Sequence, residues 1–578
     1  MGRIVAWALG ALLLLVVLAA TWIGVRGFLA YQHLDSARSV SDDVTTVLAD
    51  PTQAAALITR VSDDTSAARE LTGDVIWKAG ERLPWIGPQL SAVSTVARAL
   101  DDVASRSLKP LASVASTFSL DSIRPKNGAI DLAPFTDLDD AARAGSAGLG
   151  AAAAGVATID TRPLIGPLRG AVAEVSAVLA KARTGADTLQ RTAALLPPML
   201  GAGGPRDYLI TFQNNAEWRS LGGVGGSMVL MHTDGGRISL TAQASSSDFP
   251  EYPDPVVELT DDEIRLFGTQ PATFVQNITQ IPDFTRGAAI AQEMWKRKTG
   301  TAVDGVIALD PVTLSYLLTA TGPIGLPTGD ELNADNAVRL LLNDVYLRYE
   351  KPAMQDAFFA SAASAVFDRL TTGDIDPAEF AAALARAGSE NRLLIWSSHP
   401  EEQAALDGTT LQGNATRAEE STTNFGVFVN DATASKMNFY TELETQTAWC
   451  APGDARLRVT LRNNAPADAA DLPSYVTGGG HYGVDPGDVA TVTYIYLPEK
   501  AKLVGTKTTG TGESPGLGQG SDAGRQVIRW KTALSPGQAM TLDVRVTAPA
   551  TAEIVTRQTP TIHAPGAPAV ALGCGSAE

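Results

Sequence analysis

The sequence predicts an α+β protein of several domains: a transmembrane helix and a helical bundle, then an α/β domain, then a β-sandwich. The first observation is the apolar run Ile4 to Val25, and the second is an alanine-rich region with helical periodicity up to about residue 200. The third is a change to alternating strands and helices, and later to strands alone. A chain of 578 residues is too long for one hydrophobic core. The expected domains are 1–29 (anchor), 30–200 (helical), 205–415 (α/β) and 420–578 (β-sandwich).

The apolar run Ile4 to Val25 predicts a retained membrane anchor. Its length of about 22 residues is enough to cross roughly 30 Å of hydrocarbon. Trp7 and Trp22 lie near its two ends, where indole rings favour the membrane interface. A cleaved signal peptide is the alternative, but Leu18 to Thr21 is a poor cleavage site. We expect a single-pass protein of the cell membrane with most of the chain on the extracytoplasmic side.

The net charge and the cysteine content indicate which partners and which covalent links to expect. The net charge of −18 argues against a nucleic-acid partner, because phosphate binding needs a basic face. The two cysteines, Cys450 and Cys574, are most simply a disulfide in an exported protein, with two unrelated thiols as the alternative. Neither cysteine has metal-ligand spacing, so no metal site is predicted from them.

The helical region contains two similar segments. Pro84 to Pro88 and Pro163 to Pro167 each precede an amphipathic helix and place a proline near its start. We interpret them as a duplicated helical hairpin, with chance similarity in a chain rich in alanine and proline as the alternative.

After the linker Gly201 to Pro205, strands and helices alternate. Tyr208 to Phe212 reads as a buried strand, and Ser227 to His232 with Arg237 to Ala242 as a hairpin. The next expected elements are a helix at 285–299, a strand at 303–309, and helices at 311–321, 333–349 and 357–370. This order predicts an α/β domain.

Beyond about Glu420 the pattern is that of strands. Period-two alternation predicts strands at 456–462, 489–497, 526–530 and 540–546. Glycine-rich connections such as Gly505 to Gly524 are expected to separate them, which is typical of a β-sandwich.

The most informative polar segment is Gln213 to Gly223. It follows a buried strand, at the end of which α/β domains bind ligands. Asn214, Asn215, Glu217 and Arg219 are therefore predicted ligand-binding residues, and the guanidinium of Arg219 suits a phosphate. The alternative is a loop whose polar side chains cap its own backbone.

Two further clusters are weaker candidates. Asp248 follows the third strand, and Arg348 and Asp356 lie on or after a helix. Asp248, Asp344 and Asp356 could hold a divalent ion through oxygen ligands, but we favour a solvated surface for each. Asn430 to Lys436 is expected to be a structural turn.

Three segments together resemble the domain-of-unknown-function family 4012. They are Tyr208 to Gly226, Asp304 to Asp310 with Gly322 to Ile324, and Asn430 to Met437. The resemblance implies a membrane-anchored protein of a Gram-positive cell envelope, of a kind often linked to surface polysaccharide.

The order of elements from Tyr208 to Leu370 more distantly resembles the LytR-CpsA-Psr family. This implies an α/β domain of LytR-CpsA-Psr-like type and transfer of glycan from a polyprenyl-pyrophosphate carrier with Mg²⁺. The family's motifs match only at Arg219-Ser220 and Asp248; Arg348 and Asp356 could correspond to late helix positions, but the arginines that follow there are absent.

We therefore expect binding or assembly of surface glycan without turnover and without a cofactor. The partner would be a polyprenyl-linked glycan or a cell-wall polymer. A divergent phosphotransferase using Mg²⁺ is the alternative, so the sequence leaves open whether the protein is an enzyme. Convergence of Arg219, Asp248, Arg348 and Asp356 beside an apolar tunnel would favour binding of the carrier.

Overall fold

The computed structural model describes residues 2–41, 51–115, 124–125, 128–372, 375–417, 422–551 and 553–563. The chain divides into two compact units, Met1–Ile123 with Ile130–Gly203, and Arg124–Ala129 with Gly204–Glu578. The division after Gly203 falls within the predicted linker. The finer domain boundaries stay predictions.

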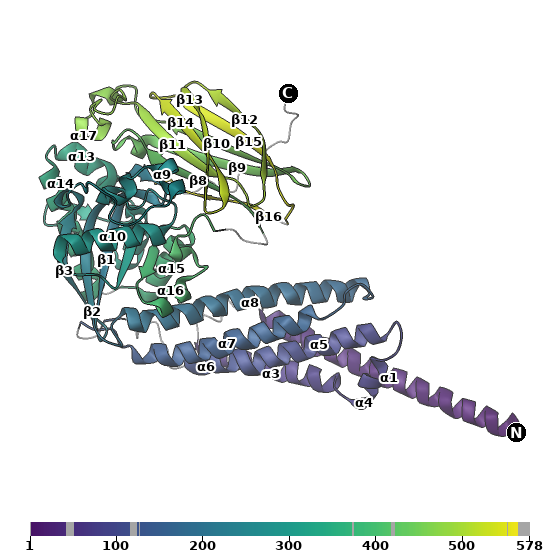
Figure 1. The fold of residues 1–578 in the computed structure, drawn as a ribbon. Coiled ribbons are helices and arrows are strands. Elements are labelled where there is room, and N and C mark those ends of the chain that lie inside the picture. The colour runs from purple at the N-terminus through teal and green to yellow at the C-terminus, as the bar shows by residue number, and fades with distance from the viewer. Residues whose placement is uncertain are drawn as a thin grey trace. The chain divides into compact units, whose positions relative to one another are not determined.

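The first unit is helical (Figure 1). Its described helices are α1 (Gly2–Ser41), α3 (Pro51–Leu71), α4 (Val75–Gly80), α5 (Gly87–Val103), α6 (Lys109–Ala115), α7 (Ala133–Ala157) and α8 (Gly166–Met199), with a π-helical turn at Ala104–Leu108. Among the described residues, α1 is the one helix long and apolar enough to cross a membrane, over Leu9–Ala37. It continues well beyond the predicted run because Ala30 packs against Ala68 of α3 and Ala97 of α5.

The two similar segments lie side by side at the starts of α5 and α8. Both helices have a proline at their first or second position, as predicted. Gln89 joins the segments: its Nε2 donates to the Pro163 carbonyl (2.8 Å), and its Oε1 accepts from the Ile165 N–H (3.1 Å).

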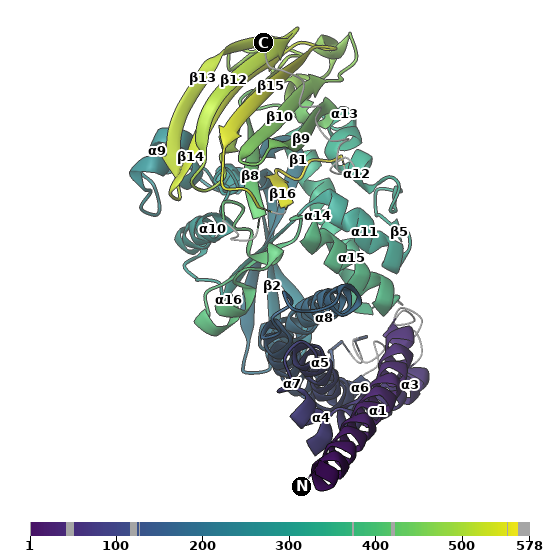
Figure 2. The same ribbon diagram turned by 90° about the vertical axis from the view of Figure 1, so that its right-hand side faces the viewer.

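The second unit begins with a five-stranded sheet in the order β3-β2-β1-β4-β7. Only β1 and β4 run parallel; the other neighbours are antiparallel. Figure 2 shows α10 on one side of this sheet and α11, α14 and α15 on the other. The bounds are β1 Arg206–Arg219, β2 Gly222–Asp234, β3 Arg237–Ser245, β4 Gly305–Leu309, β7 Leu394–Ser397, α10 Phe284–Thr299, α11 Pro311–Thr321, α14 Pro352–Thr372 and α15 Pro377–Ser389.

Shorter elements complete this part of the unit. They are α9 (Asp261–Phe267), β5 (Ile324–Gly325), β6 (Glu331–Leu332), α12 (Ala337–Arg339), a π-helical turn (Leu340–Asp344), α13 (Val345–Arg348) and α16 (Pro400–Leu406). The helix expected at 333–349 is present over residues 337–348, with a π-helical turn in its middle.

The prediction that Gln213 to Gly223 form a loop is wrong. Its residues extend β1 and begin β2, with register shifts that mark bulges after Phe212 and Asn214. Glycine is required for this pairing, because a Cβ on Gly223 would lie 2.1 Å from the Asn214 carbonyl oxygen. These glycines therefore let two strands approach, a role that their sequence did not distinguish from contact with a ligand.

The C-terminal region is rich in strands and has two sheets, β12-β15-β10-β9 and β13-β14-β11-β8-β16. One apolar core contains residues of both, among them Val427, Leu457 and Trp530. Its elements are β8 Thr422–Asp431, β9 Thr441–Ala451, β10 Asp454–Asn463, α17 Ser474–Thr477, β11 Val489–Tyr496, β12 Lys502–Gly510, β13 Glu513–Asp522, β14 Arg525–Leu534, β15 Ala539–Thr547 and β16 Glu553–Gln558.

The predicted strands of this region are confirmed, but the predicted connection Gly505 to Gly524 is wrong. It forms most of β12 and β13, each at the edge of a sheet. An exposed edge strand with many glycines carries no apolar alternation from which it could be recognised. Cys450 lies in β9, and Cys574 lies outside the described residues, so their disulfide stays a prediction.

Candidate functional site

A cavity of about 670 Å³ lies in the second unit between the sheet and the helices α11 and α14. Strand alternation creates one wall: Leu209 packs into the core beneath α10, so Ile210 and Phe212 of β1 face the opposite side. The other wall comes from the helices. Apolar side chains of both walls include Ile210, Phe212, Leu240, Leu317, Phe359, Phe367 and Leu370.

The cavity changes in polarity along α14. Gln355 and Asp356 line it at the start of this helix, and Phe367 and Leu370 line it at the end. Asp356 Oδ1 accepts a hydrogen bond from the Ser245 hydroxyl (3.1 Å), at the end of β3. The site is therefore an apolar chamber with one polar end, a form that suits an amphiphilic ligand.

Aromatic rings also lie at the polar end. Tyr475 lines the cavity and packs on Tyr346, with ring centroids 5.7 Å apart, and it is 42% exposed. Tyr482 also lines the cavity and is 70% exposed. Asn214 donates from Nδ2 to the Tyr346 hydroxyl, so the predicted residue Asn214 supports this aromatic group.

A buried charge cluster borders the same end. The Glu217 carboxylate pairs with the Lys436 ammonium and accepts from Arg219 Nη2 (3.2 Å). Lys436 Nζ lies 5.5 Å from the ring centre of Tyr475, within the range of a cation–π contact. Arg219 also donates to Asn277 Oδ1 (2.8 Å) and to the Trp218 carbonyl (2.8 Å). Of this cluster, Glu217 and Lys436 line the cavity and Arg219 does not.

These charges shift the titration of a neighbouring carboxyl. Burial opposes ionisation of Glu217, but Lys436 and Arg219 lower its pKa. Burial, and then the negative charge of Glu217, raise the pKa of Asp431 to about 6. Asp431 Oδ2 accepts from the N–H groups of Thr433 (3.0 Å) and Ala434 (2.6 Å), as in the structural turn that the sequence predicts.

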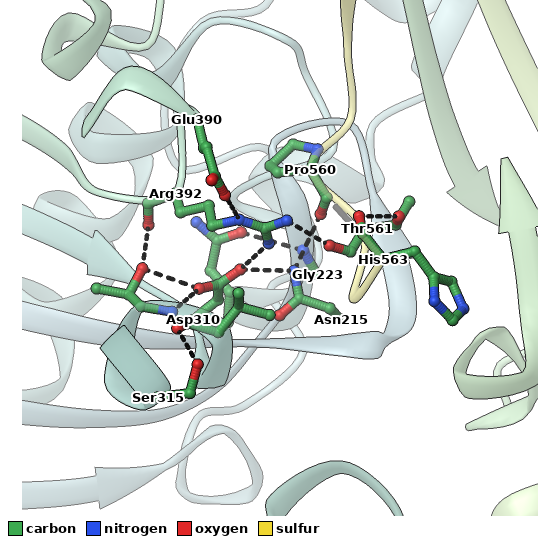
Figure 3. A network of polar contacts seen from close by, with 12 residues as sticks. Asn215, Gly223, Asp310, Ser315, Glu390, Arg392, Pro560, Thr561 and His563 are labelled. Carbon is green, nitrogen blue, oxygen red and sulfur yellow. Dashed lines mark hydrogen bonds and ion pairs between the residues drawn. The ribbon is translucent and has the colours of Figure 1, made fainter. Parts of the chain in front are cut away.

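A second polar network is centred on Asp310, which also lines the cavity (Figure 3). Asp310 Oδ1 caps α11 through the Thr313 N–H (2.7 Å), and its Oδ2 accepts from Arg392 Nη1 (2.8 Å) and Asn215 Nδ2 (3.2 Å). Arg392 also donates to Glu390 (2.7 Å) and to the Thr561 carbonyl (2.7 Å). Its side chain is 0% exposed. Burial disfavours the charge of Arg392, but Asp310 and Glu390 raise its pKa, so it stays a cation.

The structure brings some of the predicted ligand-binding residues together. Asn214, Glu217 and Asp356 line the cavity. Asp248 contacts them indirectly, because its Oδ2 accepts from the Ser245 N–H (2.8 Å).

The other predicted residues lie elsewhere. Asn215 belongs to the network of Asp310, Arg219 to the buried charge cluster, and Arg348 pairs with Asp330 (2.7 Å). Convergence of Arg219 and Arg348 with Asp248 and Asp356, which would have favoured binding of the carrier, is thus not found in these contacts, whereas an apolar cavity is present. Ligand roles for these residues stay predictions.

The divalent-ion alternative also stays untested. Within the described ranges, no group of three or more His, Cys, Asp or Glu side chains is placed to hold a metal ion. Asp344 accepts from Arg339 Nε (3.2 Å) and Asn343 Nδ2 (3.1 Å).

Sequence patterns assign no ligand-binding role to Lys436, Tyr346, Tyr475 or Asp310. Lys436 is expected in a turn, and its pairing cannot be predicted locally because its partner Glu217 lies 219 positions away. The two tyrosines carry no motif. Asp310 had a local signal, since an Asp-Pro pair before a helix indicates an N-cap, but its second role requires Arg392.

Residues 203–346 match the family model described as "Protein of unknown function (DUF4012)". The match covers less than half of the chain and spans β1 to the middle of α13, including the sheet wall of the cavity. The predicted resemblance to this family is confirmed. No curated protein matches the chain, and these comparisons give no support to the distant resemblance to LytR-CpsA-Psr proteins.

Proposed function

We propose that this is a membrane-anchored cell-envelope protein that binds one amphiphile without turning it over. In this proposal α1 holds the chain in the membrane, with both units on the extracytoplasmic side. The cavity takes the apolar chain of a membrane-derived lipid, and its polar end meets a glycan head group. The apolar cavity of about 670 Å³ carries the proposal.

Burial of an apolar chain supplies the binding energy. Each CH₂ group moved from water gains about 0.8 kcal/mol, so roughly ten of them give about 8 kcal/mol before the cost of ordering the ligand. Side chains such as Phe212 and Phe359 are only partly buried because they face this cavity. A bound chain would cover them.

The polar end favours a head group rich in hydroxyls. Ser245, Gln355 and Asp356 offer hydroxyl, amide and carboxylate groups, which pair well with sugar hydroxyls. Tyr475 and Tyr482 offer flat rings against which a sugar can pack.

The same end argues against a pyrophosphate transferase. Among the described residues lining the cavity, Lys436 is the one lysine or arginine, and Glu217 already pairs with it. Four lining residues, Glu217, Asp310, Glu350 and Asp356, carry carboxyl groups. Such a charge balance disfavours a pyrophosphate in the absence of further cations.

The proposal also includes the fold: an α/β domain of LytR-CpsA-Psr-like type and a C-terminal β-sandwich.

A cavity-filling variant tests the proposal. Ala363 lines the cavity and Ala357, on the same helix, is exposed and outside it. Full-length wild type, Ala363→Trp and Ala357→Trp would be purified from native membrane, and their bound lipids measured by mass spectrometry per mole of protein. We expect one enriched amphiphile class in wild type and Ala357→Trp, and roughly tenfold less in Ala363→Trp, since an indole occupies the chain's space. Equal enrichment in all three, or only bulk membrane lipid in wild type, would contradict the proposal.

A further inference from the structure

One end of the helical unit carries several exposed apolar side chains, which we call the apolar tip. It consists of Val75 (80% exposed), Leu83 (52%), Trp85 (89%), Ile86 (56%) and Ile165 (57%). Scattered apolar side chains are normal on a surface, but a group of this kind marks an interaction site.

Contacts within the unit hold the tip together. Val75 begins α4, and Leu83 to Ile86 form the turn between α4 and α5. Ile165 precedes α8 and is tied to this turn by Gln89, which accepts from its N–H group (3.1 Å). Trp85 has a φ of +74°, an unfavourable conformation for a residue other than glycine. The fold therefore holds a large indole at an exposed and strained position.

The tip lies beside the apolar helix α1. Asp74 caps α4 by accepting from the Ile76 and Trp77 N–H groups (2.8 Å each). The same carboxylate accepts from Trp22 Nε1 (3.1 Å) and pairs with Arg26 Nε (2.9 Å), both on α1. Val75 is therefore adjacent in sequence to the residue that contacts Trp22.

The exposed part of α1 extends beyond this contact. Leu12 to Leu18 are 53–66% exposed, so the helical unit does not cover them. Figure 1 shows α1 running past α4 toward the N-terminus, and the starts of α5 and α8 at that same end of the unit. Tryptophan and arginine are common where a helix leaves the hydrocarbon, which places Trp22 and Arg26 at the membrane interface.

We infer that the apolar tip inserts into the headgroup–acyl boundary of the bilayer that α1 spans. Val75 adjoins the residue that contacts Trp22, and the starts of α5 and α8 lie at the same end of the unit, so an α1 that crosses the membrane brings the tip to that boundary. Apolar groups bury roughly 5–10 Å deep there. The inference rests on the anchoring role of α1 in the proposed function. Its consequence is that the helical unit is fixed against the membrane by a broad apolar surface as well as by one helix.

Fluorescence quenching tests the inference on the full-length protein in nanodiscs. Comparison of wild type with Trp85→Phe isolates the emission of Trp85. We expect this emission to fall roughly twofold with lipids brominated near the top of their acyl chains, and to be shielded from aqueous iodide. Quenching by iodide without quenching by brominated lipid would overturn the inference. Shielding from both would also overturn it, and would indicate a protein surface such as a second copy.

Two controls keep the result specific. Comparison of wild type with Trp7→Phe isolates the emission of Trp7, which reports on α1 alone. If brominated lipid quenches Trp7 but not Trp85, α1 enters the membrane and the apolar tip does not, which refutes insertion of the tip without refuting the anchor. Ile165→Asp should expose Trp85 to iodide, because a carboxylate is unfavourable at the boundary. Val178→Asp, at a half-exposed site along α8, should leave Trp85 shielded. Equal iodide exposure in both aspartate variants would count against the inference.

Discussion

The cavity of the second unit and the apolar tip of the first unit are built from similar residues but have opposite shapes. The cavity is concave, and its apolar side chains, such as Phe359 and Leu370, line a hollow with one polar end. The tip is convex, and Trp85 and Val75 project from turns and a helix start. A concave surface can enclose a single chain, whereas a convex surface can enter a layer of many lipids. Shape, and not composition, therefore separates the proposed ligand site from the proposed membrane contact.

The largest expected change in stability comes from a substitution that destabilises the wall of the cavity and leaves the apolar tip unchanged. Arg392→Met leaves the Asp310 carboxylate buried without its cation, which should lower the free energy of unfolding of the second unit by about 3–5 kcal/mol. Calorimetry of the full chain in detergent should show its transition shifted downward and that of the helical unit unchanged.

Arg386→Met is the matched control. Arg386 pairs with Glu390 (3.0 Å) but is 56% exposed, so its loss should cost less than about 1 kcal/mol. Similar shifts for the two variants would show that the buried network does not hold the cavity wall.

A smaller effect is expected at Arg219, which borders the cavity without lining it. Arg219→Lys loses the fork that joins Glu217, Asn277 and the Trp218 carbonyl, so stability should fall by about 1–3 kcal/mol. The amount of bound amphiphile per folded protein, measured by mass spectrometry, should not change. Weaker ligand binding with unchanged thermal stability would instead give Arg219 the ligand role that its sequence position suggested.

The smallest effect concerns pH and Asp431. Burial and Glu217 raise its pKa in the folded protein to about 6, above the ordinary value of 3.8. The folded state therefore binds the proton more tightly, and stability is lost as pH rises from about 4 through about 6. Above that pH, Asp431→Asn should be more stable than wild type by about 1–2 kcal/mol.

Thermal unfolding at several pH values tests whether the stability contributed by Asp431 falls as pH rises. The Tm difference between Asp431→Asn and wild type should be positive at pH 8 and shrink toward pH 4. A difference that is constant with pH, or that grows in acid, would show that the carboxyl does not titrate as its surroundings indicate.

Local signals made much of the fold predictable. The helix 311–321 was bounded correctly because Asp310 and Pro311 start it and Gly322 ends it, with a φ of +70°. The strands β10 and β15 are predicted by period-two alternation of apolar residues, which matches their alternating burial in the structure. By contrast, β12 and β13 are exposed and rich in glycine, so neither burial nor alternation indicated them.

The candidate site was predictable only in part, for a physical reason. Apolar periodicity shows that a side chain faces inward, but it does not show whether the space opposite is filled. Phe212 and Val366 would look the same in a packed core. Lys436 pairs with Glu217 and Arg392 pairs with Asp310 across long stretches of sequence, so neither ion pair could be predicted from local spacing.

The central claim is that the cavity encloses an apolar chain, and photo-crosslinking tests it most directly. The probe is a glycolipid with a diazirine at the far end of its chain, incorporated into nanodiscs that hold the full-length protein. After illumination, mass spectrometry of the peptides should find crosslinks in α14 between Phe359 and Leu370, and these should disappear in Ala363→Trp. Crosslinks confined to α1, or unchanged by Ala363→Trp, would contradict the account.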